Sequence, residues 1–416
     1  MEAPNKKKPR LAVFDVEGVL ITKNRFIFDV GKSIGVAQLL KMFFIGFLYE
    51  LGVVKLKPAL KHIFKIMRGV KIETLMKVFD EVPSKPMLES FFAQLKIRNC
   101  KIALISSGLP TVVVEKLGSM VGADYAFGIE VGVNDDALTG EIWGDAIEAN
   151  GKFKILSQII AAEGVKMEDC VVVADDRNNR CIFLSGMQKI GYNPDFVLRV
   201  KADKVVTGNL SGILPIIYGK PKKRSLPLKK DVLRETIHAS GFLVSVLTGL
   251  IGVYPVALLI CVVSALYFMS ELSRMNRKNL PVISAITRSA ASQAELYAFV
   301  TAPLYFAIGI LLTLLLFPAP VNSAIIAIFT LGDSTASLFG GLISKTPLPF
   351  NKGKTVEGSL FGFFFAFLAG AVFVSPALAL IGAAVAMTVE SLPLPLNDNI
   401  TMPLCTGLAL LLLLQI

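Results

Sequence analysis

Histidine is scarce in this sequence. Among its 416 residues only His62 and His238 occur, which excludes a multi-histidine metal centre. The five cysteines show no paired spacing and stand at Cys100, Cys170, Cys181, Cys261 and Cys405. We therefore expect neither a disulfide framework nor a cysteine metal site. No apolar signal peptide opens the chain, so we expect the N-terminal domain to stay in the cytoplasm.

Apolar residues are abundant and unevenly spread. They make up 53% of the chain, and the mean hydropathy is +0.62, too high for an ordinary soluble protein. Residues 1 to about 230 mix charged and apolar residues, as a globular domain does. From about residue 237 onward nearly every window of twenty is membrane-like. The pattern predicts a soluble domain at 1–218 and a membrane domain at 231–416.

A basic segment separates the two halves. The net charge is +11, and much of it lies in Lys6–Lys8 and in residues 220–230. The second run precedes the first apolar span and contains Pro221 and Pro227. We interpret 219–230 as a juxtamembrane linker rather than a nucleic-acid patch, and we expect no nucleic-acid partner.

The C-terminal half is predicted to be an all-α polytopic membrane domain with about seven spans. These cover residues 237–253, 254–270, 295–317, 322–343, 357–375, 376–391 and 400–416. With the basic linker inside, alternation places the charged residues after Lys230 near the cytoplasmic face. The sequence thus predicts a multi-pass protein whose soluble domain and polar membrane groups both face the cytoplasm.

Acidic residues recur in this apolar half. Among them are Glu271, Asp333, Glu357, Glu390 and Asp398. Acidic groups contribute little to the positive-inside rule, so that rule does not explain them. Asp333 interrupts an apolar run, where an ionised group costs roughly 3 kcal/mol even on lenient scales. Carboxylates beside lysines on one face favour a metal–phosphate site, whereas a transporter would show an inverted repeat, which we do not find.

Several motifs in this half occur in a fixed order. They are Arg234-x-x-x-His238, Glu271-x-x-Arg274, Gly332-Asp333-x-x-Ala336, Lys354-Thr355-Val356-Glu357-Gly358-Ser359, Glu390, and Asp398-Asn399-x-Thr401-x-Pro403. Over about 230–416 the chain resembles the CTP-dependent lipid-alcohol kinases, which include dolichol kinase and phytol kinase. A P-loop is excluded, because Leu348 stands where its first glycine is required.

The resemblance implies Mg²⁺, CTP as phosphoryl donor and a membrane lipid alcohol as acceptor. It implies that Asp333 and Asp398 are catalytic, holding magnesium or orienting the hydroxyl, with Asp333 as a metal ligand. The nucleotide phosphates would meet Lys352 and Lys354. The remaining polar site would consist of Glu357, Glu390, Asn399, Arg234, His238, Glu271 and Arg274.

In the soluble half, three apolar segments each end in polar side chains. Residues 11–14 lead to Asp15 and Glu17, residues 102–105 lead to Ser106, and residues 171–174 lead to Asp175. Ligands collect at the carboxyl ends of parallel strands, so these segments predict an α/β Rossmann-like sheet with its site at that edge.

These segments resemble the haloacid dehalogenase superfamily, in its phosphoserine-phosphatase-like branch. The resemblance implies a phosphomonoester substrate, Asp15 as nucleophile and Glu17 as general acid/base. Ser106 would bind phosphate, and Lys152 would neutralise the nucleophile, with Lys154 as the alternative. The resemblance implies that residues of the first and fourth motifs hold magnesium. These residues are Asp15, Glu17, Asp175 and Asn179.

Two features depart from that family. The fourth motif usually reads Gly-Asp-Gly-x-x-Asp, but here Asp176 replaces its second glycine and Asn179 its last acid. We still expect activity, because Asp15, Ser106 and Lys152 persist. A helical cap is expected at about 22–95, and Lys23 stands where an acidic group for a substrate amine is usual, which argues against phosphoserine.

We therefore predict a CTP-dependent kinase of a polyprenol, isoprenoid or related lipid alcohol, fused to a magnesium-dependent phosphomonoesterase. One alternative is a membrane-anchored phosphatase whose C-terminal half is a lipid-binding anchor. Another is a non-enzymatic lipid-binding membrane protein. The sequence leaves open which lipid alcohol is used and what the oligomeric state is.

Overall fold

The computed structural model describes residues 9–23, 25–50, 53–82, 88–218, 229–275, 281–290, 300–343, 346–394 and 397–414. Internal contacts divide the chain into two compact units, Met1–Lys222 and Lys223–Ile416. The predicted basic linker at 219–230 lies outside the described residues except for Lys229 and Lys230, which begin a helix.

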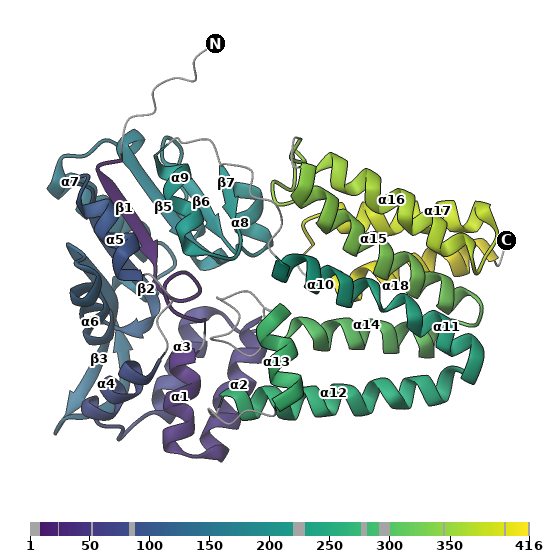
Figure 1. Ribbon diagram of the computed structural model, residues 1–416. Coiled ribbons are helices and arrows are strands. Elements are labelled where there is room, and N and C mark those ends of the chain that lie inside the picture. Colours follow the sequence, from purple (N-terminus) through teal and green to yellow (C-terminus); the bar gives the residue numbers. More distant parts are fainter. Residues whose placement is uncertain are drawn as a thin grey trace, which may run out of the picture. The chain divides into compact units, whose positions relative to one another are not determined.

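A sheet in the order β4-β3-β2-β1-β5-β6-β7 forms the centre of the first unit (Figure 1). Its strands are β1 (Leu11–Asp15), β2 (Lys101–Pro110), β3 (Tyr125–Asn134), β4 (Ala137–Trp143), β5 (Cys170–Ala174), β6 (Gln188–Tyr192) and β7 (Lys204–Val206). All neighbours pair in parallel except β3 and β4. Every residue of β1 and β5 is buried, as in strands covered on both faces. The predicted α/β fold is confirmed.

The helices described in this unit are α1 (Arg25–Ile34), α2 (Val36–Glu50), α3 (Leu56–Ile66), α4 (Ile72–Glu81), α5 (Leu88–Lys96), α6 (Thr111–Val121), α7 (Gly151–Glu163), α8 (Phe196–Lys201) and α9 (Ile213–Ile217). Short 3₁₀ turns cover Asp145–Ile147, Met167–Asp169, Arg177–Ile182 and Leu210–Gly212.

The helical cap predicted at about 22–95 falls on several helices. Helices α1 to α4 follow β1 and form the cap (Figure 1). In α5, however, the rings of Phe91 and Phe92 stand edge-on to Phe14 of β1, with centroids 5.7 and 5.0 Å away. Helix α5 therefore packs against the sheet, and we propose that the cap ends with α4, at Glu81.

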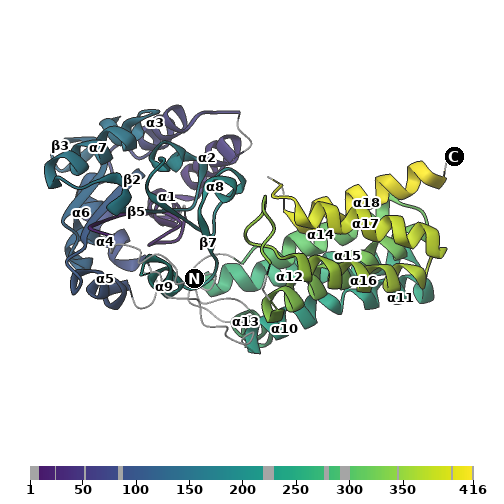
Figure 2. The same cartoon turned by 90° about the horizontal axis from the view of Figure 1, so that it is seen from above.

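The second unit is helical. It contains α10 (Lys229–Ala239), α11 (Phe242–Ile251), α12 (Val253–Met275), α13 (Pro281–Ala290), α14 (Ala302–Leu316), α15 (Val321–Ile343), α16 (Val356–Ala371), α17 (Pro376–Ser391) and α18 (Asp398–Leu414). Figure 2 shows α12 and α14 to α18 running alongside one another. Helix α15 packs against α10, α11, α14, α16, α17 and α18. At Gly362 of α16 a β-carbon would lie 2.8 Å from the Gly332 carbonyl oxygen, so glycine lets α15 and α16 approach closely.

The expected seven spans are only partly matched by helix length. Among the described residues, two helical segments, Val253–Arg274 and Val321–Ile343, are long and apolar enough to cross a membrane. The predicted first span is divided, because α10 ends at Ala239 and α11 begins at Phe242. Helices α14, α16, α17 and α18 are apolar but shorter. Part of the predicted third span, residues 295–299, lies outside the described residues.

Candidate active sites

The three predicted strands deliver their polar residues to one edge of the sheet. Asp15 is the last residue of β1, Ser106 lies in β2, and Asp175 directly follows β5. Because β1 pairs in parallel with both β2 and β5, these positions lie side by side. Asp15, Ser106 and Asp175 are distant in the sequence. The sheet brings them together, as the motifs predicted.

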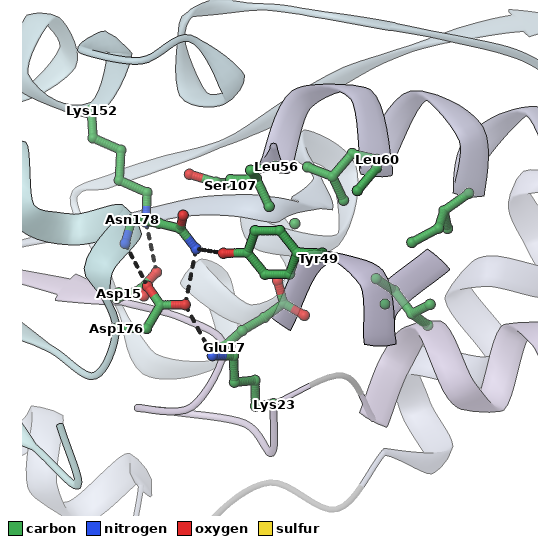
Figure 3. Close-up of a pocket in the computed structure, with 15 residues that line it drawn as sticks. Asp15, Glu17, Lys23, Tyr49, Leu56, Leu60, Ser107, Lys152, Asp176 and Asn178 are labelled. Atoms are coloured by element: carbon green, nitrogen blue, oxygen red, sulfur yellow. Dashed lines mark hydrogen bonds and ion pairs between the residues drawn. The ribbon is translucent and has the colours of Figure 1, made fainter. Parts of the chain in front are cut away.

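Asp15 is buried and held on both carboxylate oxygens. Its Oδ1 accepts from the Lys152 ammonium at 2.9 Å and from the Val16 backbone N–H at 3.0 Å. Its Oδ2 accepts from the Asn179 amide nitrogen at 2.5 Å. Lys152 also donates to Asn179 Oδ1 at 2.7 Å. These contacts fix the orientation of the Asp15 carboxylate and neutralise its charge. Figure 3 shows Lys152 and Asp15 facing each other.

Lys152 reaches this position because α7 begins immediately before it. A β-carbon at Gly151 would lie 1.4 Å from the Asp145 carbonyl oxygen, so only glycine fits there. The Lys152 side chain is 3% exposed. Burial alone would lower its pKa, but the charges of Asp15 and Asp176 raise the pKa of this lysine above its ordinary value. Lys152 is therefore a permanent buried cation beside Asp15.

Three carboxylates gather at the sheet edge. One ligand oxygen from each of Asp15, Asp175 and Asp176 lies within 4.8 Å of the others, and all three residues are buried. Asp175 Oδ1 has no hydrogen-bond partner. Burial, and then the charges of Asp176 and Asp15, raise the pKa of Asp175 well above its ordinary value. A buried set of oxygen ligands with one unsatisfied oxygen fits Mg²⁺, which prefers such ligands.

Asp176 is a member of this group that the motif comparison did not assign to the metal. Its Oδ2 lies 3.1 Å from the Lys23 ammonium. Although burial alone would raise it, Lys23 and Lys152 hold the pKa of Asp176 below its ordinary value. The signal in the sequence was the doubled aspartate after an apolar strand. Asn179, expected as a ligand, instead places its amide between Lys152 and the carboxylates of Asp15 and Asp176.

Glu17, which we also expected to bind the metal, lies outside the three-carboxylate group. Its carboxylate rests against the backbone of β2, where a β-carbon at Gly108 would lie 1.8 Å from Glu17 Oε2. Burial, and then the charge of Asp15, raise the pKa of Glu17 to about 7. A carboxyl group with that pKa can donate and accept a proton near neutral pH, as a general acid/base requires.

Ser106 and Ser107 have different surroundings. The Ser106 hydroxyl oxygen accepts from the backbone N–H groups of Gly108 and Leu109, at 3.2 and 3.1 Å, and stabilises the end of β2. Ser107 lines the cavity above Asp15, and its hydroxyl donates to the Ala146 carbonyl at 2.8 Å. The predicted phosphate-binding residue therefore shapes the backbone, while its neighbour faces the cavity.

The cap covers the reacting groups. Figure 3 shows Tyr49 of α2 beside Asn178, and the Asn178 amide donates to its hydroxyl at 2.6 Å. The guanidinium of Arg177 lies 5.5 Å from the centre of the same ring. The cavity between cap and sheet also contacts Asp15, Glu17, Lys23, Lys152 and Asp176. It is therefore a site in which a substrate would meet both the carboxylates and the cap.

In the helical unit, His238 of α10 joins two other helices. Its ring nitrogens lie 3.0 Å from Ser334 Oγ and 3.0 Å from Asn399 Oδ1. Its Nε2 is also 3.6 Å from Asp333 Oδ2. The rings of Phe306 and Phe329 pack against the imidazole. Asp333, predicted from its place in an apolar run, is thus brought together with His238 and Asn399.

The Lys354 ammonium lies close to two carboxylates, those of Glu390 and Asp398. Its ammonium lies 2.5 Å from Glu390 Oε1 and 3.6 Å from Asp398 Oδ2. Burial alone would lower its pKa, but Glu390, Asp333 and Asp398 raise the pKa of Lys354 strongly. Glu390 is 1% exposed, and its Oε2 has no hydrogen-bond partner. The segment before α16 therefore carries a cation into a group of carboxylates from α15, α17 and α18.

Other predicted residues of this unit make separate contacts. Arg274 forms an ion pair with Glu271 at 2.7 Å, and Glu271 also accepts from the Val300 backbone N–H. Glu357 accepts from the backbone N–H of Thr346 at 3.2 Å. Two further predicted residues of this unit are Arg234 and Lys352. Arg234 is paired with Glu235 at 3.1 Å, and Lys352 lies in the segment between α15 and α16.

With this geometry in place, comparison with known proteins defines the class of the first unit. The haloacid dehalogenase-like hydrolase family matches residues 12–178. The N-terminal domain is therefore similar to haloacid dehalogenase-like hydrolases.

The chain is also similar to particular proteins. A phosphoserine phosphatase from Methanocaldococcus jannaschii is 28% identical over 197 residues, covering 47% of this chain and 92% of the relative. A solved phosphoserine phosphatase, a phospho-aspartyl intermediate analogue, is 28% identical with a TM-score of 0.44, covering 48% of this chain and 94% of that one. The chloroplastic phytol kinase 1 of Arabidopsis thaliana is 26% identical over 212 residues, covering 44% of this chain and 67% of the kinase.

Proposed function

We propose that the N-terminal domain is a magnesium-dependent phosphomonoesterase with Asp15 as its nucleophile. The observation that carries this proposal is the Asp15 carboxylate, buried between the Lys152 ammonium and the carboxylates of Asp175 and Asp176. A carboxylate so oriented and charge-balanced can attack phosphorus to form an aspartyl-phosphate. The similarity to phosphoserine phosphatases supports the same chemistry.

The reaction proceeds in two steps. Asp15 attacks the phosphorus of the monoester, the ester P–O bond breaks, and the proton of Glu17 goes to the departing alcohol oxygen. A water molecule then gives a proton to Glu17 and attacks the aspartyl-phosphate, releasing inorganic phosphate and restoring Asp15. Lys152 neutralises the negative charge at both stages. A Mg²⁺ held by Asp15, Asp175 and Asp176 would supply further positive charge to the phosphate oxygens.

Phosphate release from p-nitrophenyl phosphate by the full chain, with Mg²⁺ present, tests this proposal. We expect turnover by the wild type and none by Asp15→Asn. Asp135→Asn makes the same chemical change at an exposed turn and serves as the control. Equal turnover by the wild type and Asp15→Asn would contradict the proposal.

For the helical unit we propose a second activity, phosphorylation of a lipid alcohol by CTP. The specific observation is the convergence of His238, Asp333 and Lys354 with carboxylates from α17 and α18. The similarity to phytol kinase supports it. The lipid hydroxyl would attack the γ-phosphorus, its proton would pass to Asp333 or Asp398, and CDP would leave. Lys354 would neutralise the phosphate charge, since positioning and electrostatics do most of the work in phosphoryl transfer.

We further propose that this unit is a multi-pass membrane domain with its polar cluster on the cytoplasmic side. Large apolar side chains are exposed on several helices, among them Leu250 of α11, Leu258 of α12, Leu360 of α16 and Leu412 of α18. Exposed apolar surface of this extent is unfavourable in water and favourable against lipid. The shorter helices α14, α16, α17 and α18 share this exterior and supply the crossings beyond the two long helices.

Transfer from γ-labelled CTP, with ATP in parallel, to a panel of lipid alcohols tests the kinase proposal. The assay uses the Asp15→Asn background, in which the N-terminal domain cannot remove the product. We expect labelled lipid with CTP, loss of the label in Asp333→Asn, and retention in Asp231→Asn as the matched control. No labelled lipid with either nucleotide would leave the C-terminal half as a lipid-binding anchor of a phosphatase.

A further inference from the structure

The cavity above Asp15 has an aliphatic wall on its cap side. The residues that form this wall are Ile27 of α1, Gly46 of α2, and Leu56, Ala59, Leu60 and Ile63 of α3. The charged residues of the cavity lie elsewhere, at the sheet edge, at the start of α7 or in the segment leading into the cap. Among the residues that line it, those on α1, α2 and α3 therefore offer no ion-pair partner to a substrate.

Several polar groups of the cavity are already paired with one another. Lys152 is paired with Asp15, and Lys23 with Asp176. The Tyr49 hydroxyl accepts from the Asn178 amide, so the polar end of this cap residue is turned towards the fourth motif. These groups serve the reaction centre and the contact between cap and sheet. What remains for the part of a substrate beyond its phosphate is the aliphatic wall.

The aliphatic wall should disfavour a charged phosphate monoester, such as a phosphorylated amino acid, and favour an alkyl phosphate. A phosphorylated amino acid carries an ammonium and a carboxylate next to its ester oxygen. Placed against Leu60 and Ile63, which are buried, these charges would lose their hydration without gaining partners. An alkyl group in the same position would instead be favoured by leaving water.

We propose that this site takes the phosphate monoester of an apolar alcohol, an alkyl or prenyl phosphate, and that Leu60 and Ile63 set its specificity. The proposal rests on the phosphatase function proposed for Asp15 and names its substrate class. It departs from phosphoserine, the amino-acid ester after which the related phosphatases are named. The phosphate lies at Asp15 and Lys152, and the carbon chain lies along α3.

A series of unbranched alkyl monophosphates, from methyl to hexyl phosphate, tests the wall directly. The full chain is assayed for phosphate release, with Asp15→Asn as the blank and O-phospho-L-serine as the competing substrate class. We expect kcat/KM to rise by up to about fourfold for each methylene group until the wall is filled, the value that burial of a methylene gives. O-phospho-L-serine should be no better than methyl phosphate.

Variants of α3 then locate the effect. Leu60→Asn should lower kcat/KM for pentyl phosphate by about tenfold or more relative to kcat/KM for methyl phosphate, which does not reach the wall. The control is Leu40→Asn, the same change at a cap residue that is 63% exposed and outside the cavity. Should Leu60→Asn lose methyl phosphate hydrolysis through misfolding, Leu56→Asn, at a half-buried position, makes the same test.

The possible results separate the two proposals. A flat alkyl series, or phosphoserine hydrolysed as efficiently as pentyl phosphate, would overturn the apolar specificity and leave the phosphatase function standing. Absence of Asp15-dependent phosphate release from every monoester would overturn both. A rising series that Leu60→Asn flattens, while Leu40→Asn does not, establishes the wall as the determinant of specificity.

Discussion

A β-carbon at Gly108 would lie 1.8 Å from Oε2 of Glu17 and 2.9 Å from its carboxyl carbon. The backbone at the end of β2 is therefore the surface on which the Glu17 carboxylate rests. Close approach of a side chain to this backbone requires a residue without a β-carbon. The position of the proposed general acid is thus set by a glycine far away in the sequence.

Gly108→Ala is expected to displace Glu17 and to lower kcat for alkyl monophosphates by about 10²-fold, the usual lower range for loss of a general acid. Glu17→Gln should lower kcat by a similar factor. Because both changes act on the same group, the double variant should be hardly slower than either single one. Steady-state kinetics of the four proteins measure this, and additive losses would show that Gly108 acts on something other than Glu17.

The pH dependence of hydrolysis follows from the same carboxyl group. Burial, and next the charge of Asp15, raise the pKa of Glu17 to about 7. As the acid of the first step Glu17 must be protonated, so the active fraction is near one below this pH and falls about tenfold for each pH unit above it. We expect kcat/KM for an alkyl phosphate to fall accordingly above pH 7.

The substrate phosphate also titrates near neutrality, so the control is the ratio of wild-type to Glu17→Gln kcat/KM at each pH. This ratio removes the substrate's own titration and should keep the decline above pH 7. A ratio that does not change between pH 6 and 9 would rule out Glu17 as the acid of the first step.

Much of the N-terminal site could be predicted because the carboxyl ends of parallel strands lie at the same edge of a sheet. Asp15, Ser106 and Asp175 each follow an apolar run, and a parallel sheet places the ends of such runs at one edge. The doubled aspartate could not be interpreted in the same way. Asp176 stands where related proteins have glycine, and only the three-dimensional arrangement shows its carboxylate close to Asp15 and Asp175.

The boundary of the cap and the number of spans were harder to predict for a different reason. Helix α5 directly follows the cap helices in the sequence, and the contact of Phe91 and Phe92 with Phe14 places it against the sheet. In the helical unit, the predicted first span joined the last residues of the polar helix α10 to the apolar helix α11. There a β-carbon at Gly241 would lie 2.6 Å from the Phe306 ring, a packing constraint that composition does not reveal.

Magnesium should stabilise the N-terminal domain and be required for its activity. Asp175 Oδ1 has no hydrogen-bond partner, and three buried carboxylates repel one another in the metal-free protein. Removal of divalent metal with EDTA is expected to abolish phosphate release and lower Tm, and added Mg²⁺ should restore both. Asn179→Asp adds a fourth carboxylate beside Asp15, so it should lower Tm in EDTA and enlarge the rise in Tm with Mg²⁺.

Asn134→Asp, the same change at an exposed position of β3, is the matched control and should leave both values unchanged. Thermal unfolding of the full chain across a range of Mg²⁺ concentrations measures the effect. If Asn179→Asp shows the wild-type Tm in EDTA and the wild-type response to Mg²⁺, its side chain does not belong to the metal site.

In the helical unit, variants of Lys354 and Glu390 test whether the role of Lys354 is structural or catalytic. Lys354 Nζ lies 2.5 Å from Glu390 Oε1, and Glu390 is almost fully buried. Lys354→Met should leave that carboxylate uncompensated and destabilise the protein by about 3 kcal/mol or more. The double variant Lys354→Met/Glu390→Gln removes both charges and should recover most of the lost stability, measured as Tm in detergent.

Phosphoryl transfer from γ-labelled CTP should nevertheless stay lost in the double variant, because the cation that would meet the nucleotide phosphates is still absent. Lys229→Met, which removes an exposed lysine at the start of α10, should keep both stability and transfer. Recovery of transfer together with stability in the double variant would make Lys354 a structural partner of Glu390 only. Loss of transfer with stability restored assigns the Lys354 ammonium to the reaction itself.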